Sequence, residues 1–271
     1  MMIQSENKII GGGLLELPVD KRDFNYPKVF GAIKKTTDED FIIGKTEILD
    51  QDNSDYCTGF STCSASAIQE GKILNPFWSF AVSKMISGDL DAYGQDLRTA
   101  LKVHTKYGAI EDMVDKGRSI NEYPSDLFDK AIEHKKQSYF SVFGIDLFNE
   151  IRSALWTHKS ACITGAVWKN DWSNAKDGII TEEIGDEMGG HAFIFIGQKK
   201  INDKIYLVAQ LSNGIEFGDK GLFYFPKEVI NRDCRFGTFC FIDMPVEEAR
   251  KKSWSLIRQF WEQIKLLLKS F

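Results

Sequence analysis

Two stretches decide how this chain folds: Gln51-Asp-Asn-Ser-Asp-Tyr-Cys57-Thr-Gly-Phe60 near its front and Gly189-Gly-His191-Ala-Phe-Ile-Phe-Ile-Gly197 towards its back. Cys57 opens a run rich in Ser, Ala and Gly that reaches to about Gln69. Such small side chains let a helix pack tightly on several sides. His191 opens an apolar run of the kind that forms a buried strand. We therefore expect a central helix that begins at the cysteine and a strand that begins at the histidine.

Outside these stretches, a helical half of the chain precedes a strand-rich half. Helical patterns cover residues 96–107, 125–135 and 145–158. Short β-rich runs between turn residues follow at 161–168, 191–197, 204–211, 221–225 and 236–244. This order predicts an α+β fold in which a helical lobe and an antiparallel β lobe meet across a groove.

Three segments are expected along the chain. Residues 1–48 form an N-terminal arm, 49–245 a single domain, and 246–271 a C-terminal amphipathic helix. In the last segment apolar residues recur at spacings of three and four beside a basic polar side. The helix could fold back onto its own domain, associate with a second copy or partner helix, or lie on a membrane surface. The apolar stripe alone does not choose among these roles.

Composition and charge limit the classes of function. The chain has 271 residues, 43% of them hydrophobic, which suffices for a large core without metal or disulfide support. A net charge of −5 argues against a general nucleic-acid-binding surface. The 5 cysteines are odd in number and irregularly spaced, unlike a secreted disulfide framework or a zinc site. With no secretory signal or membrane-spanning run, these features predict an intracellular protein, placed in the cytoplasm, that binds no metal.

The two quoted stretches resemble the papain-like cysteine peptidases. Gln51, Cys57 and Phe60 match the spacing of the nucleophile motif in that family. Further similar stretches follow in the same order: 94–108 resembles the substrate-wall loop and helix, 189–192 the histidine strand, and 211–221 the later loop. The resemblance covers about residues 14 to 244. It implies a two-lobed hydrolase that cuts peptide bonds in a cleft between the lobes, acts on peptide or protein substrates and needs no cofactor.

The chemistry of the residues agrees with the roles that this resemblance implies. A thiol at a helix N-terminus near an imidazolium should have a lowered pKa, which would make Cys57 a thiolate nucleophile. His191 would pair with it and later protonate the leaving amine. Gln51 and the Cys57 backbone N–H would donate to the developing oxyanion. Cys63 lies on another side of the same helix and is expected to be structural. His104 lies on an apolar helix face and is expected to be a core or pocket histidine.

The chain departs from the family where an asparagine orients the histidine. Leu211 stands at that position. Asn213 points to the same side of an extended strand and could take over the bond, with Gln210 as the competing candidate. If neither side chain reaches His191, the triad is reduced to a dyad.

Other departures concern substrate binding, which we expect at Tyr56, Gly94, Gln95 and Gly190. Tyr56 replaces a small residue of the family, and Gln95 stands where a second glycine normally bonds the substrate backbone. A narrow cleft is therefore expected. The long helical prosegment of many relatives is not seen, so any latency is expected to come from the N-terminal arm or the C-terminal helix.

Two alternatives to a peptidase remain at this stage. The same residues could serve another thiol acyl transfer, as in an amidase, transglutaminase or isopeptidase. The chain could also be a non-catalytic binding or assembly module, a reading that Leu211 favours. Retention of Gln51, Cys57 and His191 together favours catalysis.

Overall fold

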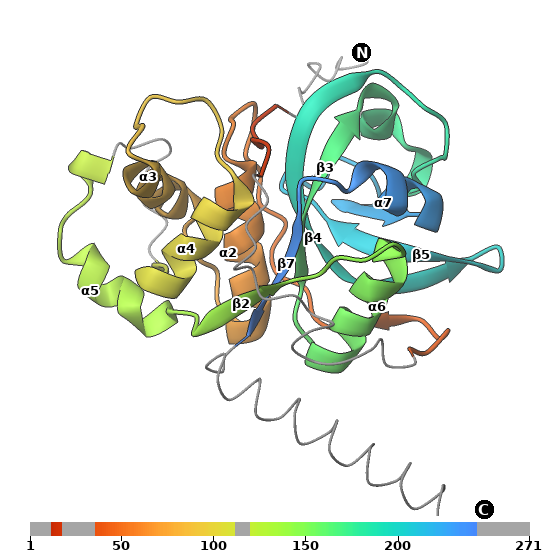
Figure 1. Cartoon of the computed structure of the whole chain (residues 1–271), viewed down its shortest axis with the longest axis horizontal. Coiled ribbons are helices and arrows are strands. Elements are labelled where there is room, and N and C mark those ends of the chain that lie inside the picture. Colours follow the sequence, from red (N-terminus) through yellow and green to blue (C-terminus); the bar gives the residue numbers. More distant parts are fainter. Residues whose placement is uncertain (1–11, 18–35, 112–119, 243–271) are drawn as a thin grey trace, which may run out of the picture.

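A computed structural model of the chain describes residues 12–17, 36–111 and 120–242. The C-terminal helix expected at 246–271 and most of the N-terminal arm lie outside these residues. Figure 1 shows helices on one side and a sheet flanked by two further helices on the other. The chain thus has the two-lobed α+β architecture that the sequence predicts.

Most of the α-helices of the described residues form one lobe of the molecule, and two lie against the sheet of the other lobe (Figure 1). The α-helices are α2 (Cys57–Glu70), α3 (Pro76–Ser87), α4 (Leu97–Lys106), α5 (Leu127–Ala131), α6 (Leu147–His158) and α7 (Lys227–Asp233). Short 3₁₀ turns are η1 (Ile120–Glu122), η2 (Ile132–His134), η3 (Asn170–Asn174) and η4 (Lys176–Gly178). Helices α2 to α5 make up the helical lobe, and α6 and α7 lie against the sheet (Figure 1).

The strands form one antiparallel sheet. They are β1 (Phe41–Ile42), β2 (Ser138–Ser141), β3 (Cys162–Lys169), β4 (Glu187–Ile201), β5 (Lys204–Gln210), β6 (Leu222–Phe225) and β7 (Thr238–Ile242). Their order is β2-β7-β3-β4-β5-β6, and β1 pairs with β4. The long strand β4 pairs with β3 over residues 187–195 and with β5 over residues 194–201, so it joins the two halves of the sheet.

Small residues let the helices of the first lobe approach one another. A side chain at Gly59 would place its Cβ 2.6 Å from the carbonyl oxygen of Pro76, so α3 packs directly on α2 because this position is a glycine. Asn75 caps α3 by accepting the backbone N–H groups of Phe77 and Trp78. The helix α2 is buried along most of its length, as expected of a central helix.

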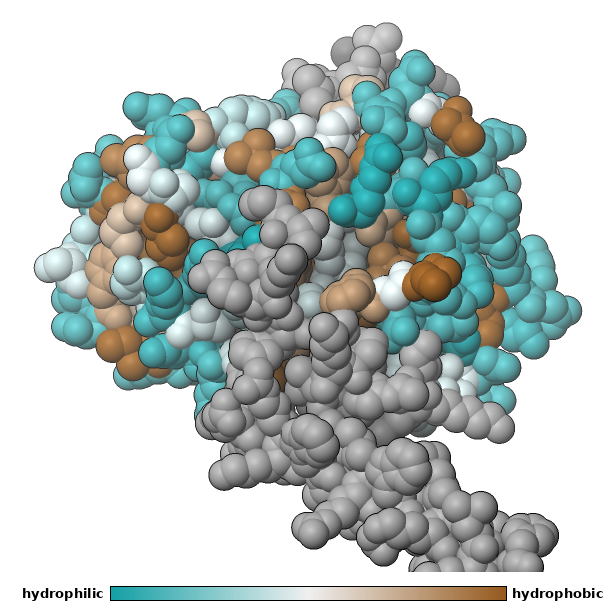
Figure 2. Space-filling model, in the orientation of Figure 1, coloured by the Kyte–Doolittle hydropathy of each residue, from teal (hydrophilic) through white to brown (hydrophobic). Residues whose placement is uncertain are grey.

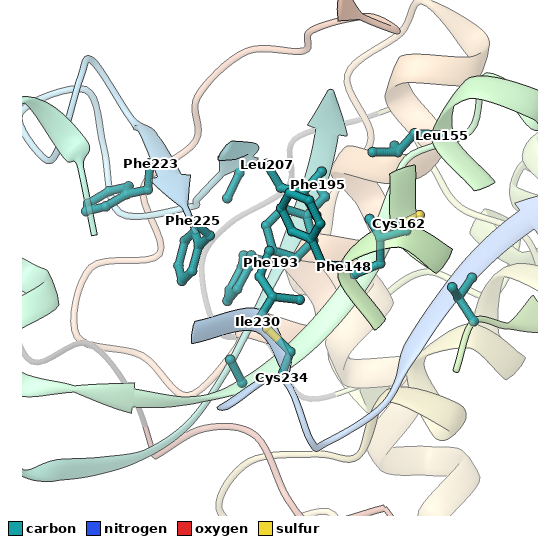
Figure 3. Close-up of a cluster of buried hydrophobic side chains, with 14 of the residues drawn as sticks. Phe148, Leu155, Cys162, Phe193, Phe195, Leu207, Phe223, Phe225, Ile230 and Cys234 are labelled. Carbon is teal, nitrogen blue, oxygen red and sulfur yellow. The ribbon is translucent and has the colours of Figure 1, made fainter. Parts of the chain in front are cut away.

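The core of the β lobe is aromatic. Figure 3 shows Phe193, Phe195 and Phe225 gathered beside Phe223 and Ile230. The rings of Phe193 and Phe225 stack at 5.2 Å, and both meet Phe195 edge-on. These rings cover one face of β4, and the alternate residues Ala192, Ile194 and Ile196 pack in the cluster that contains Cys57 and Ala65 of α2.

Some elements were not foreseen. The helix α3 is rich in aromatic and apolar residues and so lacks a clear helical period, although Asn75-Pro76 is a recognisable helix start. The short elements α7 and β2 were also missed. The helix expected at 125–135 is instead a short α5 continued by η2.

On the face drawn in Figure 2, hydrophobic residues form separate patches within a largely hydrophilic surface. None of the helices in the described ranges has the length and apolarity that a bilayer span requires.

Candidate active site

The first turn of α2 meets the start of the apolar part of β4. The sulfur of Cys57 lies within hydrogen-bonding reach of the backbone N–H of Ala192, the residue after His191. Cys57 is 0% exposed and His191 is 1% exposed. Strand pairing holds His191 opposite Ala166 of β3. The two remote stretches of sequence are therefore neighbours at the junction of the lobes.

Burial opposes the charged forms of both side chains. It raises the pKa of the Cys57 thiol to about 12, although the backbone N–H groups of Ala192, Thr58 and Cys57 itself lower it, and the negative charge of Asp55 adds to the rise. Burial lowers the pKa of His191 to about 4. The expectation of a lowered thiol pKa is therefore wrong for this closed arrangement, because loss of solvation outweighs the helix N-terminus. The pair is neutral here.

The side chain of Asn213 interacts with the imidazole of His191. Its interaction with the imidazole raises the pKa of His191, against the larger effect of burial. Gln210, the competing candidate, instead directs its Nε2 to the carbonyl oxygens of Thr46 and Glu47, at 3.4 Å each. Of the two candidates for orienting His191, the structure places Asn213 beside it.

Gln51 is held by the loop that carries Asn213. Its Oε1 accepts from the Ser212 hydroxyl at 2.7 Å, and its backbone N–H donates to the Ser212 carbonyl at 2.8 Å. Its Nε2 donates one hydrogen to the Ser54 carbonyl at 2.9 Å. A primary amide carries two such hydrogens, so a second N–H remains for another acceptor.

A piece of the N-terminal arm lies across this junction as an extended strand. Leu14 bridges to Gln95 in parallel and to Gly190 in antiparallel fashion. The backbone N–H groups of Gly12 and Leu14 donate to the Gly190 carbonyl at 2.9 and 3.1 Å. Gln95 donates to the Gly13 carbonyl at 3.0 Å and accepts from the Leu15 N–H at 3.1 Å. Both lobes thus present backbone groups to one peptide.

The Leu14 side chain is buried in the same apolar cluster as Cys57 and Ala192. A Cβ on Gly165 would approach Leu14 Cδ2 to 2.5 Å, and one on Gly190 would lie 2.5 Å from the Leu14 carbonyl oxygen. The glycines therefore leave room for a bulky aliphatic side chain and for a closely paired backbone.

The residues expected to bind substrate separate into two groups. Gln95 and Gly190 contact the 12–15 segment through their backbones, and Gly94 packs against Gly13. Tyr56 instead lies just before α2 with its ring 4.3 Å from that of Phe80. Its ring therefore packs on α3.

Sequence reasoning missed two supporting residues. The Trp168 ring meets the His191 ring edge-on at 5.3 Å and shields it from one side. Ser212 fixes the Gln51 amide as described above. The apolar strand around Trp168 gave no sign of this contact, which arises from pairing of β3 with β4.

A second cysteine and histidine meet inside the helical lobe. The Cys63 sulfur lies 3.9 Å from Nε2 of His104, whose ring also contacts the hydroxyls of Ser66 and Ser79 at 3.1 and 3.3 Å. All are buried. Within the described ranges, no group of three or more His, Cys, Asp or Glu side chains could hold a metal ion.

No protein-family model and no curated protein matches this sequence. Solved structures do resemble it in fold. Xylellain, a cysteine protease from Xylella fastidiosa, is 19% identical with a TM-score of 0.71, over 90% of this chain and 100% of its own. Bromelain from Ananas comosus is 14% identical with a TM-score of 0.60, over 77% and 100% of the two chains.

A third similar structure is proCathepsin B S9 from Trypanosoma congolense, with 15% identity and a TM-score of 0.63, over 86% of each chain. These similarities cover from 77% to 90% of this chain. At such low identity they establish architecture and leave residue roles to the geometry of the site. The chain has a papain-like peptidase fold.

Proposed function

We propose that this protein is a cysteine peptidase in which Cys57 is the nucleophile and His191 its general acid and base. One observation carries the proposal. An extended peptide, residues 12–15, already lies between backbone groups of Gln95 and Gly190, and its Leu14 packs in the same apolar cluster as Cys57. Pairing to main-chain groups on both sides suits a peptide substrate better than a small amide.

The reaction begins with the neutral pair. When a substrate peptide replaces residues 12–15, His191 accepts the Cys57 S–H proton as sulfur attacks the scissile carbonyl carbon, forming the C–S bond. The carbonyl oxygen becomes an oxyanion and accepts from the Cys57 backbone N–H and the second Gln51 amide N–H. Asn213 holds the imidazole and favours its protonated form.

His191 then returns the proton to the leaving nitrogen as the C–N bond breaks, which leaves a thioester on Cys57. Water attacks this acyl-enzyme with His191 as base, and the acid product leaves with regeneration of the thiol. Throughout this sequence the proton moves between the Cys57 sulfur, the His191 imidazole and the leaving nitrogen.

A labelling experiment tests the assignment of the nucleophile. The full chain would be treated with iodoacetamide near neutral pH and the adduct located by mass spectrometry, with Cys57→Ala as the control. We expect one adduct, at Cys57, that forms faster after the 12–15 segment is displaced. Equal labelling of all cysteines, or labelling that spares Cys57 in the opened site, would overturn the assignment.

Product analysis separates peptidase activity from its alternatives. A peptidase releases two fragments, one with a new free carboxyl group. An acyl-transfer enzyme forms a new amide when an amine is supplied, because the amine competes with water for the thioester. A non-catalytic module binds peptide without turnover, and complete burial of Cys57 and His191 is the observation that favours that reading.

A further inference from the structure

Residues 12–15 pair on the helical-lobe side with an irregular loop. The residues from Gly88 to Gln95 connect α3 to α4 without helix or extended strand. Gly94 has φ of +70°, and a Cβ there would lie 2.4 Å from the Gly13 carbonyl oxygen. A glycine is therefore needed for close pairing, yet it makes the loop backbone freer. Contacts other than those of Gly94 itself must therefore fix the orientation of the Gly94–Gln95 backbone.

A buried lysine holds this loop from inside the helical lobe. Lys84 of α3 is 5% exposed. Its ammonium donates to the Ala92 carbonyl and, at 2.5 Å, to the Gly94 carbonyl. Burial lowers the pKa of Lys84, while the carboxylates of Asp55 and Asp89 raise it. Hydrogen bonds from a charged donor are roughly twice as strong as neutral ones, so the loop is firmly anchored.

An acidic side chain holds the same residue from the other side. Asp55, two positions before Cys57, accepts the backbone N–H of Gly94 through its Oδ2. The side chain of Gln95 completes the support: its Nε2 donates to the Ser83 carbonyl at 3.2 Å and its Oε1 accepts the Asp96 N–H at 2.9 Å. The backbone N–H and C=O of Gln95 are left facing the bound peptide.

We propose that Lys84 and Asp55 are positioning residues that set the peptide-binding edge at Gly94 and Gln95. The Lys84 ammonium donates to the Gly94 carbonyl, and the Asp55 carboxylate accepts the Gly94 N–H. Together these bonds fix the orientation of the adjoining Gln95 backbone. Both side chains act on Gly94, and the backbone of Asp55 itself packs closely against Gly13. The inference rests on the proposed function, because it assumes that a substrate uses the edge now occupied by residues 12–15. Accurate placement matters since an error of about 1 Å in substrate position can cost about 100-fold in rate.

The test compares two reagents for the same thiol. A peptidyl epoxide with a leucine residue needs the Gln95 edge, whereas iodoacetamide needs only the sulfur. The ratio of their second-order labelling rates at Cys57 is measured in the full chain and repeated in Leu14→Asp, which opens the site. For Lys84→Met we expect this ratio to fall about tenfold, the effect of losing hydrogen bonds to a charged group.

Matched variants separate positioning from folding. Lys84→Arg keeps a buried cationic donor and should restore most of the ratio. Asp55→Asn keeps an acceptor for the Gly94 N–H and should retain the ratio, whereas Asp55→Ala should lower it. Lys72→Met removes an exposed lysine that pairs with Glu111 away from the loop, and should leave the ratio unchanged. Thermal unfolding checks that each variant is folded.

The outcomes are distinguishable. Failure of iodoacetamide to label Cys57 in the opened site would overturn the proposed function itself. Normal labelling with an unchanged ratio in Lys84→Met and Asp55→Ala would overturn the positioning role and leave the function standing. An equal fall in Lys84→Met and Lys84→Arg would show that packing, and not hydrogen-bond donation, is what matters at this position. If Lys84→Met does not fold, the comparison of Asp55→Asn with Asp55→Ala tests the positioning role.

Discussion

The helix α2 carries two buried cysteines: Cys63 contacts the His104 ring, and Cys57 lies against the backbone N–H of Ala192, the residue after His191. In both, burial raises the thiol pKa to about 12, and the histidine pKa falls to about 4 for His191 and about 3 for His104. Cys57 starts the helix, receives backbone N–H groups and lies beside a bound peptide strand. Cys63 lies mid-helix and is enclosed with His104 and serines. A cysteine and a histidine alone therefore do not make a site; the backbone N–H donors and the neighbouring 12–15 segment distinguish Cys57 from Cys63.

Replacing each cysteine should separate the pairs most clearly. Cys57→Ala should lower peptide cleavage by about 10⁴-fold or more, since removal of a nucleophile leaves only binding and oxyanion contributions. Cys63→Ala should keep activity within about twofold and cost about 1 kcal/mol in the free energy of unfolding. Steady-state cleavage and urea unfolding measure the two effects. Equal loss of activity in both variants would remove the distinction.

Leu14→Asp should expose Cys57 to solvent and leave Cys63 buried. An ionised carboxylate costs several kcal/mol in the apolar pocket by Gly165 and Ala192, so the segment should be displaced. Labelling of Cys57 should accelerate by about 10- to 100-fold, given that each 1.4 kcal/mol is a factor of ten. Cys63 should stay unlabelled. Leu15→Asp is the matched control because Leu15 is 41% exposed.

The third comparison concerns the residue that orients the histidine. Asn213→Ala should lower kcat about tenfold with little change in KM, because a hydrogen bond to the imidazolium is lost in the transition state. Gln210→Ala should change kcat by less than about threefold, since Gln210 turns towards Thr46 and Glu47. A larger effect of Gln210→Ala would reverse their assigned roles.

The last comparison concerns the stability of the fold against acid. An unfolded histidine takes up a proton near pH 6.5, whereas the folded pKa is about 3 for His104 and about 4 for His191. Between these values the unfolded state binds more protons, so the free energy of unfolding should fall as pH drops from 6.5 towards 4. Urea unfolding at several pH values measures this slope, which His104→Gln should reduce by removing one group.

Much of the architecture is readable from local pattern. The small residues after Cys57 predict α2, and the apolar run after His191 predicts a strand that becomes part of β4. The α+β fold class follows from the order of the elements. The missed helix α3 shows the limit of periodicity, because a helix buried on most sides has no polar face to reveal its period.

The candidate site was predictable in its residue types and not in its protonation state. The spacing from Gln51 to Cys57 and the apolar run after His191 indicate these three residues as candidates for the site. The thiol pKa depends on how much solvent the fold removes, and the 12–15 segment and the partner lobe make burial the larger effect. No local pattern shows that residues 12–15 return to pair with Gln95 and Gly190.

The amino-acid sequence by itself determined the α+β class, the helix that begins at Cys57 and the strand that follows His191, because these depend on side-chain size and periodicity along a short stretch. Tertiary structure alone decided that Asn213 faces His191 while Gln210 turns away, and that Lys84 reaches the loop before α4. It also decided that burial lowers the pKa of His104 and His191. These properties depend on distances between segments remote in sequence and on exclusion of water, which no local stretch encodes.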